Sequence, residues 1–489
     1  MESPDKKKII KNKLENLIGK DNVISSEDEL IAFECDGLTN YRIKPAFVVL
    51  PGSTEEVSAI VRLCYEEEIP FVPRGAGTGL SGGALPNREG IVISLSKMNR
   101  ILEIDIANRF AVVQPGVVNN WVTNAVSPYG YYYAPDPSSQ IVCTIGGNVA
   151  ENSGGVHCLK YGVTTNHVLG VEMVMPDGEV ICAGGKAQDH TGYDILSLIV
   201  GSEGLLGIVT KIILRIIKKP EAVKTLFASF ENIENAGLSV SDIISAGVIP
   251  AGMEIMDNLS INAVQQSVNA GYPSDAGAIL LIELDGPRAE VESHMPLVLD
   301  VLKNNDATDI KVAKDAKERE LFWKGRKNAF AAMGRVSPQY YVQDGVIPRS
   351  QLANVLKEVE KLSRDTGLRV ANVFHAGDGN LHPLILYNAS NPGEAEKAEE
   401  LAASILKACV DAGGSITGEH GVGFDKKNYI PVMFGEDDVD TMNLVRCAFD
   451  TKGICNPGKV FPTPRTCVEP GSKPHKSHPL EVEGIADLF

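Results

Sequence analysis

Residues 73–86 read PRGAGTGLSGGALP, and this glycine-rich loop decides how the N-terminal part of the chain folds. Small side chains separate its five glycines, so that Leu80 is the only bulky side chain between residues 75 and 83. A structural turn needs one or two glycines, whereas a run of them lets consecutive backbone amides converge on a bound anion. We therefore interpret the loop as a phosphate-binding site.

The loop also matches a dinucleotide-binding fingerprint, and we reject that match. GTGLSG (77–82) has the pattern G-x-G-x-x-G, follows an apolar strand, and has Glu103 downstream as a candidate ribose-binding acid. In that fingerprint the last glycine opens a helix, whose N-terminal amides bind the pyrophosphate. Here Gly83 and Pro86 follow, and then the strand IVISL (91–95), so that no helix fits. The sequence therefore predicts a dinucleotide site without the Rossmann helix.

Three later segments have the same character as the loop. Each combines proline or glycine with small hydroxyl or amide side chains, and each lies between apolar strands. We expect them to line one extended ligand together with the loop. They are PDPSS (135–139), TIGGNVAENSGG (144–155) and GSEGLLGIVT (201–210).

Regular elements are predicted on both sides of these segments. The N-terminus predicts a charged helix with Ile9, Ile10, Leu14 and Leu17 on one face. Two β-α-β units in residues 221–320, with their helices on one side of a sheet, indicate the α+β class. Before the loop we expect strands at 46–50 and 69–73, separated by a helix after the capping box of Ser53 and Glu56. The two units have strands at 226–230 and 251–256, and at 278–284 and 310–313.

Charge and cysteine usage exclude several classes of function. The net charge of −17 disfavours binding to nucleic acid or to acidic membrane surfaces. The N-terminus lacks a signal peptide's apolar core, and no stretch approaches the ~20 apolar residues of a membrane helix. The nine cysteines contain no C-x-x-C, so we expect reduced, buried thiols and no iron–sulfur cluster. These features predict a soluble, cytoplasmic protein that a partner could hold at a membrane.

A predicted hairpin carries two histidines. In NVFHAGDGNLHPLILY (372–387), Asp378-Gly379 is typical of a two-residue turn, which would place His375 directly opposite His382. Two imidazoles at that separation can bind one divalent metal, although a purely structural pair of histidines fits the geometry as well. Glu419 and His420, in GGSITGEHGVG, add a carboxylate and a third imidazole.

These motifs, in this order along the chain, resemble those of a known superfamily. PGSTEEV (51–57), the four glycine-rich segments and KYGVTTNHV (160–168) resemble the FAD-binding domain of the vanillyl-alcohol oxidase and p-cresol methylhydroxylase superfamily. HAGDGNLH (375–382), TGEHGVG (417–423) and NPGKVFP (456–462) resemble its D-lactate and glycolate dehydrogenase branch. The resemblance spans roughly residues 40–462. It implies a two-part FAD-binding domain and an α+β cap domain whose antiparallel sheet is covered by helices. We expect these domains at 1–220 and 221–462, with Asn456 returning to the flavin, and a flexible tail at 463–489.

The resemblance also implies FAD and the residues that bind it. Related enzymes often tether FAD through a histidine, for which His157 is the nearest candidate, but its context resembles the non-covalent branch. Residues 73–86 and 138–155 would hold the diphosphate and flavin, and 201–210 the adenosine side. The expected FAD-binding residues are Pro73, Arg74, Gly75, Ala76, Gly77, Thr78, Gly79, Ser81, Gly82, Pro135, Asp136, Ser138, Ser139, Thr144, Gly146, Gly147, Asn148, Asn152, Ser153, Gly154, Gly155, Glu203, Gly204, Gly207, Ile208, Val209 and Asn456.

The resemblance to the metal-dependent members of the family implies a metal site. Its ligands would be His375, His382 and Glu419. Two imidazoles and one carboxylate suit Zn, Fe(II) or Mn. A 2-hydroxy acid would chelate this metal, His420 would act as general base, and hydride would pass to flavin N5 to give the 2-oxo acid.

FWKGRKNAF (322–330) resembles the family segment that supplies an arginine for the substrate carboxylate, here Arg326, although a solvated helical arginine is the alternative. Members that oxidise longer diacids carry further polar residues where this chain has Phe330 and Val342. This departure favours D-lactate or glycolate over 2-hydroxyglutarate.

Three other functions stay open at this point: an oxygen-using oxidase, a reductase fed by NADPH, and a non-catalytic FAD-carrying electron-transfer subunit. The histidine and glutamate set argues against the last. The chain offers no cysteine cluster, haem motif or Rossmann site to receive electrons from FAD. We therefore expect an electron-transfer partner, either an iron–sulfur subunit or an electron-transferring flavoprotein, with a basic docking face. The tail with Lys473 and Lys476 either adds to this docking or has no role.

Overall fold

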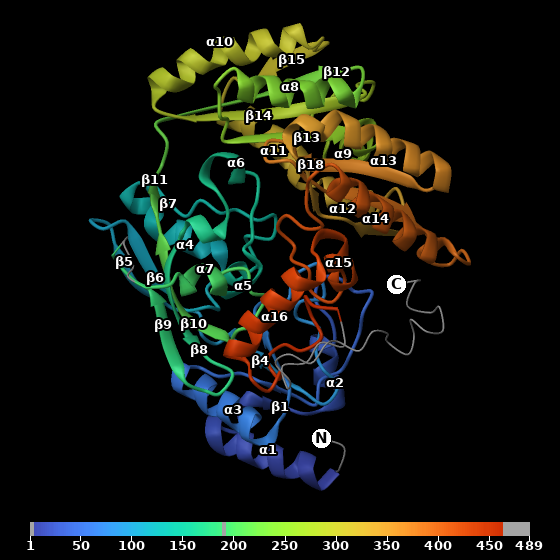
Figure 1. Cartoon of the computed structure of the whole chain (residues 1–489). Coiled ribbons are helices and arrows are strands. Elements are labelled where there is room, and N and C mark those ends of the chain that lie inside the picture. The colour runs from blue at the N-terminus through green and yellow to red at the C-terminus, as the bar shows by residue number, and fades with distance from the viewer. Residues whose placement is uncertain (1–3, 188–191, 463–489) are drawn as a thin grey trace. The chain divides into compact units, whose positions relative to one another are not determined.

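The computed structural model describes residues 4–187 and 192–462, which divide into two compact units (Figure 1). The first unit comprises Met1–Ser153, Val163–Lys218 and Glu419–Phe489, and the second comprises Gly154–Gly162 and Lys219–Gly418. The predicted flexible tail, 463–489, lies outside the described residues.

The first sheet of the first unit contains the predicted strand–helix–strand. Its order is β1-β2-β4-β3, with β4 parallel to both β2 and β3. Ser53 Oγ accepts the Glu56 N–H at 3.3 Å, and the Glu56 carboxylate accepts the Gly52 N–H at 2.7 Å, so the predicted start of the helix is confirmed. The elements are β1 (Val23–Ile24), β2 (Phe47–Val49), α3 (Thr54–Glu67), β3 (Phe71–Arg74) and β4 (Ile91–Ser94).

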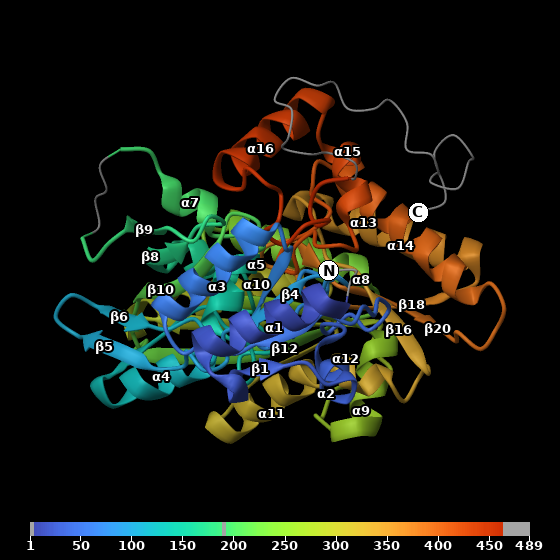
Figure 2. The same ribbon diagram turned by 90° about the horizontal axis from the view of Figure 1, so that it is seen from below.

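The N-terminal helix, α1 (Pro4–Ile18), packs against α3, as the view from below shows (Figure 2). Its buried residues are Ile10, Leu14 and Ile18, at i, i+4 spacing. Ile9 and Leu17, which were predicted on the same face as Ile10 and Leu14, are exposed.

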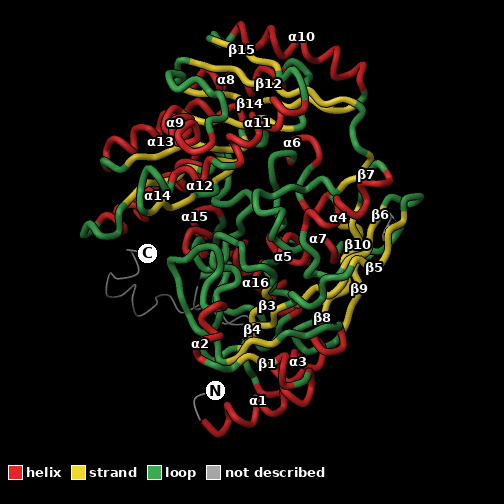
Figure 3. The backbone as a smooth tube through the Cα atoms, turned by 180° about the vertical axis from the view of Figure 1, so that it is seen from behind, coloured by secondary structure: helices red, strands yellow, loops and turns green. Residues whose placement is uncertain are grey.

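The second sheet of the first unit is antiparallel, with the order β5-β6-β10-β8-β9 (Figure 3). Its core also includes residues of α4 (Asn119–Val126) and α5 (Ile145–Glu151). Between β3 and β4 the chain forms turns and no helix over residues 75–90, all of which are described, so the Rossmann match is rejected correctly. The strands are β5 (Ile101–Asp105), β6 (Phe110–Val113), β8 (Val168–Val174), β9 (Val180–Gly184) and β10 (Ile208–Arg215).

The second unit is built on one antiparallel sheet. Its main order is β15-β12-β14-β13-β18; beyond β18 lie β20 and β16, and also β19 and β17. Both predicted β-α-β units are confirmed, with α8 (Ile233–Ser245) between β12 and β13 and α10 (Arg288–Asn304) between β14 and β15. The strands are β12 (Ala222–Phe230), β13 (Gly252–Asp257), β14 (Ala278–Gly286), β15 (Asp309–Val312), β16 (Gln339–Val342), β17 (Gly345–Val346), β18 (Arg369–His375), β19 (Asn380–Leu381) and β20 (Pro383–Tyr387).

Helices cover both faces of this sheet. α8 and α10 pack together against one face, as predicted (Figure 1). Three helices that the sequence analysis did not predict share a core with Phe227 and Leu281 on the other face. They are α9 (Asn258–Val268), α11 (Ala316–Lys327) and α12 (Ala329–Met333).

The histidine hairpin forms in a different register from the predicted one. His375 lies opposite Asn380, not opposite His382, because the turn spans four residues, Ala376–Gly379. Only Gly379 has positive φ (81°), and the Asp378 carboxylate accepts the Asn380 N–H at 3.2 Å. A two-residue turn would need positive φ at both positions. The partner differs by an even number of residues, so both histidines still lie on one face of the sheet.

The cysteines match the expectation only in part. Cys64, Cys143, Cys158, Cys409 and Cys455 are buried cysteines outside any disulfide, whereas Cys182, also outside a disulfide, is exposed. Cys447 is engaged in a disulfide, so the expectation of thiols throughout was wrong for this residue.

Within the part of the chain that the structure describes, no helix has the length and apolar composition that a membrane span requires.

Candidate active site

Glu254 lies at the centre of a buried polar cluster in the second unit. It is opposite His375 on the neighbouring strand, and its Oε1 lies 2.8 Å from His375 Nδ1. Its other oxygen, Oε2, accepts the Arg326 Nε–H at 2.7 Å. All three side chains are nearly inaccessible, at 0% for Glu254, 4% for His375 and 3% for Arg326. Glu254 was not among the predicted site residues.

Arg326 reaches this cluster because of how α11 begins and packs. The Asp315 carboxylate accepts the N–H groups of Lys317 and Glu318, which starts the helix. Phe322 and Arg326, at i and i+4, then face the interior. The alternative of a solvated arginine is therefore wrong.

His382 completes the pair of histidines. Its ring lies edge-on to that of His375, with ring centroids 5.1 Å apart. Its Nδ1 faces the backbone carbonyl of Gln343 at 3.4 Å. A carboxylate and a carbonyl can only accept hydrogen bonds, so in a neutral ring the proton would be on Nδ1 and the lone pair on Nε2. That tautomer is the one in which Nε2 can bind a metal.

Asp344 fixes the chain that leads to Glu419 and His420. Its Oδ2 accepts the Thr417 hydroxyl at 2.6 Å and the Gly418 N–H at 3.0 Å, and its Oδ1 lies 3.8 Å from His382 Nδ1. Gly418 itself abuts Asn380, whose side chain lies 2.6 Å from where a Cβ would be. Glu419 and His420 are the next two residues and begin the last segment of the first unit. Covalent continuity places the Glu419 Cα about 3.8 Å from that of Gly418.

Apolar side chains flank this cluster. The ring of Phe330 contacts His382 edge-on at a centroid distance of 6.0 Å, and it lies 5.9 Å from the Arg326 guanidinium carbon. Val342 packs against the same hydrophobic core as Phe330. Both positions that the sequence analysis singled out are thus apolar and placed in the second unit with Arg326.

Several buried polar atoms of this cluster lack a protein partner. Among the described residues, Arg326 Nη2, Gln343 Oε1 and Asn380 Oδ1 have no hydrogen-bond partner. Buried polar groups are normally satisfied, so these atoms are available to hydrogen-bond a polar ligand.

The glycine-rich segments converge in the first unit, as close approaches of three glycines show. A Cβ on Gly75 would lie 2.4 Å from Thr144 Oγ1, one on Gly83 2.8 Å from Glu151 Oε1, and one on Gly204 2.7 Å from Pro73. The Asn456 amide donates to the carbonyls of Gly83 (3.0 Å) and Glu203 (2.8 Å). Segments 73–83, 144–151, 203–207 and Asn456 therefore surround one place in this unit.

Buried polar atoms without partners also cluster here. Ser81 Oγ, Thr144 Oγ1 and Asn456 Oδ1 have none within the described ranges. Burial raises the pKa of Asp36 to about 6, and it lowers the pKa of Lys459 to about 7. Neither group was predicted from the sequence. The unpartnered oxygens and the glycine backbone fit a large polar cofactor such as FAD.

Glu203 braces the segment after His420 within the first unit. Its carboxylate accepts the N–H groups of Val422 (2.7 Å) and Gly423 (2.6 Å). Both oxygens are thus used on the protein backbone.

The remaining predicted FAD-binding residues lie as follows. Pro135 is held by Asn119, whose amide donates to its carbonyl at 3.1 Å and to Asn148 at 3.0 Å, and Asn119 was missed from the sequence. Ser138 and Ser139 lie in consecutive tight turns over 137–143. Gly154 and Gly155, unlike Ser153, belong to the second unit.

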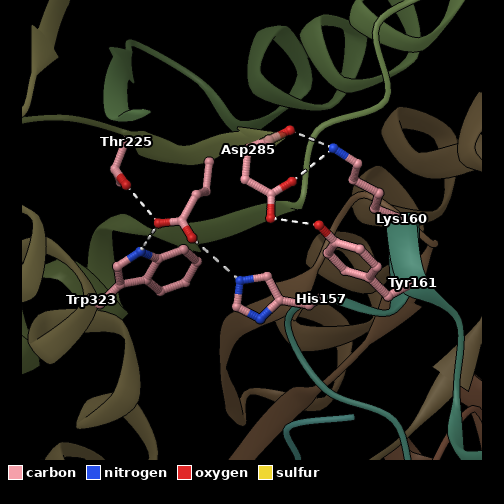
Figure 4. A network of polar contacts seen from close by, with 7 residues as sticks. His157, Lys160, Tyr161, Thr225, Asp285 and Trp323 are labelled. Atoms are coloured by element: carbon pink, nitrogen blue, oxygen red, sulfur yellow. Dashed lines mark hydrogen bonds and ion pairs between the residues drawn. The ribbon is translucent and has the colours of Figure 1, made fainter. Parts of the chain in front are cut away.

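His157 is engaged by the second unit (Figure 4). Its Nε2 lies 3.3 Å from Glu283 Oε1, while Glu283 Oε2 accepts the Trp323 indole N–H (2.7 Å) and the Thr225 hydroxyl (2.6 Å). Burial opposes ionisation of Glu283, but these donors outweigh it and lower its pKa. The same segment is held by Asp285, which accepts from Lys160 and Tyr161, each at 2.7 Å.

Comparisons with known proteins agree on one family. The FAD binding domain matches residues 45–184, and the C-terminal domain of FAD linked oxidases matches residues 219–460. The chain is 51% identical to the glycolate oxidase subunit GlcD of Escherichia coli (strain K12), over 92% of this chain and 90% of that protein. It is 41% identical to GlcD of Bacillus subtilis (strain 168), covering 93% and 97%, and 34% identical to the D-lactate dehydrogenase of Anaerostipes hadrus, covering 86% and 90%.

The solved structure of p-cresol methylhydroxylase with substrate bound shares the fold. Its TM-score is 0.79 at 18% identity, with 94% of this chain and 97% of that chain covered. The expected two-part FAD-binding fold with an α+β domain is thereby confirmed. Since its relatives match it over most of their length, the chain belongs to the family of FAD-linked oxidases.

Proposed function

We propose that this protein is an FAD-dependent dehydrogenase that oxidises a small D-2-hydroxy acid, glycolate or D-lactate, to the 2-oxo acid. The observation that carries the proposal is the buried cluster of His375, His382 and Arg326, with a guanidinium nitrogen that has no partner among the described residues. The cluster offers imidazoles for a cation and a guanidinium for a carboxylate. The names of the relatives, glycolate oxidase and D-lactate dehydrogenase, support this substrate class.

FAD would be held without a covalent bond by the converging glycine segments of the first unit and by Asn456. When bound, FAD supplies the acceptor for the hydride of the substrate α-carbon. The glycines let the backbone approach the cofactor, and the unpartnered atoms of Ser81, Thr144 and Asn456 would bond to it. The resemblance of the segment around His157 to the non-covalent branch supports the absence of a tether.

We assign His375, His382 and Glu419 as ligands of a divalent cation, Zn, Fe or Mn. The hydrogen-bond acceptors beside Nδ1 of both histidines support this assignment, as does the anchoring of Gly418 by Asp344. When bound, the cation lowers the pKa of the substrate hydroxyl.

The protein's own groups then bind and deprotonate the substrate. Arg326 Nη2 would bind its carboxylate and orient the α-carbon. His420 would take the hydroxyl proton on an imidazole nitrogen. Phe330 and Val342 leave no polar partner at their positions for a second carboxylate, which favours a short monocarboxylate.

Electrons would leave through a partner protein, an iron–sulfur subunit or an electron-transferring flavoprotein. The naming of two relatives as subunits supports this, and so does the absence of C-x-x-C from the sequence. The net charge of −17 favours a partner with a basic docking face, and we propose a cytoplasmic location.

An anaerobic titration tests the proposal. The holoenzyme is mixed with D-lactate, L-lactate, glycolate and D-2-hydroxyglutarate, and flavin absorbance is followed. We expect bleaching by glycolate or D-lactate and none by L-lactate. Bleaching by D-2-hydroxyglutarate alone would overturn the substrate assignment, and no bleaching by any acid would overturn the proposed activity.

A further inference from the structure

We propose that Glu254 is a positioning residue that serves the metal ligand His375 and the substrate-binding Arg326 at the same time. The inference rests on the proposed function, and it assigns a task to a residue that touches neither substrate nor metal.

The first step is the geometry of the carboxylate. Its two oxygens are divided between two partners, His375 Nδ1 at 2.8 Å and Arg326 Nε at 2.7 Å. Glu254 is in the middle of β13, between β14 and β18, so its backbone is fixed on both sides by strand pairing. The carboxylate therefore has one place and one orientation.

The second step is what this does to His375. A carboxylate accepts only, so it keeps the proton on Nδ1 and directs the Nε2 lone pair away from β13. Carboxylate partners of this kind orient metal-binding histidines and raise their basicity. Glu254 thus selects both the tautomer and the ring orientation that a cation requires.

The third step is what it does to Arg326. Glu254 binds Nε, and the neighbouring nitrogen Nη2 on the same edge of the planar guanidinium has no partner in the described chain. A buried guanidinium needs a counter-charge, which Glu254 supplies. The Glu254 carboxylate thereby sets the distance between the His375 imidazole, which would bind the cation, and the Arg326 guanidinium, which would bind the substrate.

The structure contains a matched control in Glu283. It lies diagonal to Glu254 on the same face of the sheet, since Glu283 pairs with Gly252 and Leu281 with Glu254. It is also buried, and it also accepts from a histidine and from a residue of α11, in this case His157 and Trp323 (Figure 4). Its carboxylate binds His157, Trp323 and Thr225. The two residues share burial and chemistry, and they differ in which histidine and which α11 residue they bind.

The experiment compares Glu254→Gln with Glu283→Gln in the FAD-loaded protein. Zinc affinity is measured by competition with a chromophoric chelator, together with FAD content, Tm, and kcat and KM for D-lactate with an artificial dye. We expect Glu254→Gln to weaken zinc binding roughly 10- to 100-fold and to raise KM, while FAD content stays at the wild-type level. Both variants are expected to lower Tm by a similar amount. Glu283→Gln is expected to leave zinc affinity unchanged.

The outcomes distinguish a failure of the role proposed for Glu254 from a failure of the metal assignment. Wild-type zinc affinity and KM in Glu254→Gln would overturn the role of Glu254, and so would equal losses of zinc affinity in both variants. If wild-type enzyme binds no metal and loses nothing to a chelator, the metal assignment in the proposed function fails instead. Should Glu254→Gln not fold, Glu254→Asp retracts the carboxylate by one methylene. It should weaken zinc binding and raise KM, and wild-type values would contradict the proposal.

Discussion

Glu254 and His375 lie opposite each other on antiparallel neighbouring strands, and the Glu254 carboxylate accepts the His375 Nδ1–H at 2.8 Å. This contact joins the middle of the sheet to the hairpin that carries both histidines. The same carboxylate reaches α11, so strand, hairpin and helix meet at one buried charge. The predictions below test the groups arranged around it.

His382→Ala should lose the metal and hydroxy-acid oxidation and keep FAD, because the His375 and His382 rings, with centroids 5.1 Å apart, would bind the cation together. Metal content by elemental analysis and dye-linked turnover measure this. His294→Ala, on α10 of the same unit, is the control and should retain both. Full activity in His382→Ala would make the hairpin purely structural.

His420→Ala should retain metal and lose turnover, and loss of metal in this variant would make His420 a ligand.

Arg326→Lys should reduce kcat/KM for D-lactate roughly 10- to 100-fold, since a charged hydrogen bond contributes about 1.5–3 kcal/mol. The lysine keeps a counter-charge for Glu254 but loses the planar fork. Steady-state kinetics and metal content measure the effect, and metal should be retained. Lys324→Met, exposed on the same helix, should behave as wild type. An unchanged KM in Arg326→Lys would remove Arg326 from substrate binding.

Acid denaturation should release FAD into a yellow supernatant, because the segment around His157 resembles the non-covalent branch and no tether is expected. Absorbance of pellet and supernatant after centrifugation measures this. His157→Ala should carry the same FAD per chain as the wild type. A yellow pellet, turned colourless by His157→Ala, would show a covalent bond.

Stability should depend on the protonation of Asp36, whose pKa burial raises from 3.8 to about 6. The folded protein binds this proton more tightly than the unfolded chain, so the stabilisation is complete below pH ~4 and is lost as pH rises to ~6. The loss is roughly 3 kcal/mol, at about 1.4 kcal/mol per pKa unit. Asp36→Asn cannot titrate, so its Tm relative to wild type should rise between these pH values. A constant difference in Tm would contradict the assigned pKa.

Reduced enzyme should react slowly with oxygen and rapidly with an artificial dye, because electrons are expected to cross to a partner. Parallel assays of hydrogen peroxide and dye reduction with D-lactate or glycolate measure the ratio. Peroxide formation at the dye rate would make the protein an oxidase and remove the need for a partner.

The sequence by itself determined the local elements and the family. The glycine loop without a following helix, the capping box at Ser53 and the two β-α-β units were all predicted, because short-range spacing and turn chemistry decide them. The histidines of the hairpin were predicted to share a face and do so, since side-chain alternation survives a register change of two residues.

Only the tertiary structure decided the rest. The turn at Asp378 is longer than predicted. The Gly379 carbonyl accepts the Ile347 N–H at 3.0 Å, a contact for which the local sequence gives no signal. In the sequence, Glu254 is one of two acidic residues in the otherwise apolar strand GMEIMD. Its role depends on His375, 121 residues away, and on Arg326, 72 residues away. Such contacts arise from strand register and helix packing, which no pattern within either segment encodes.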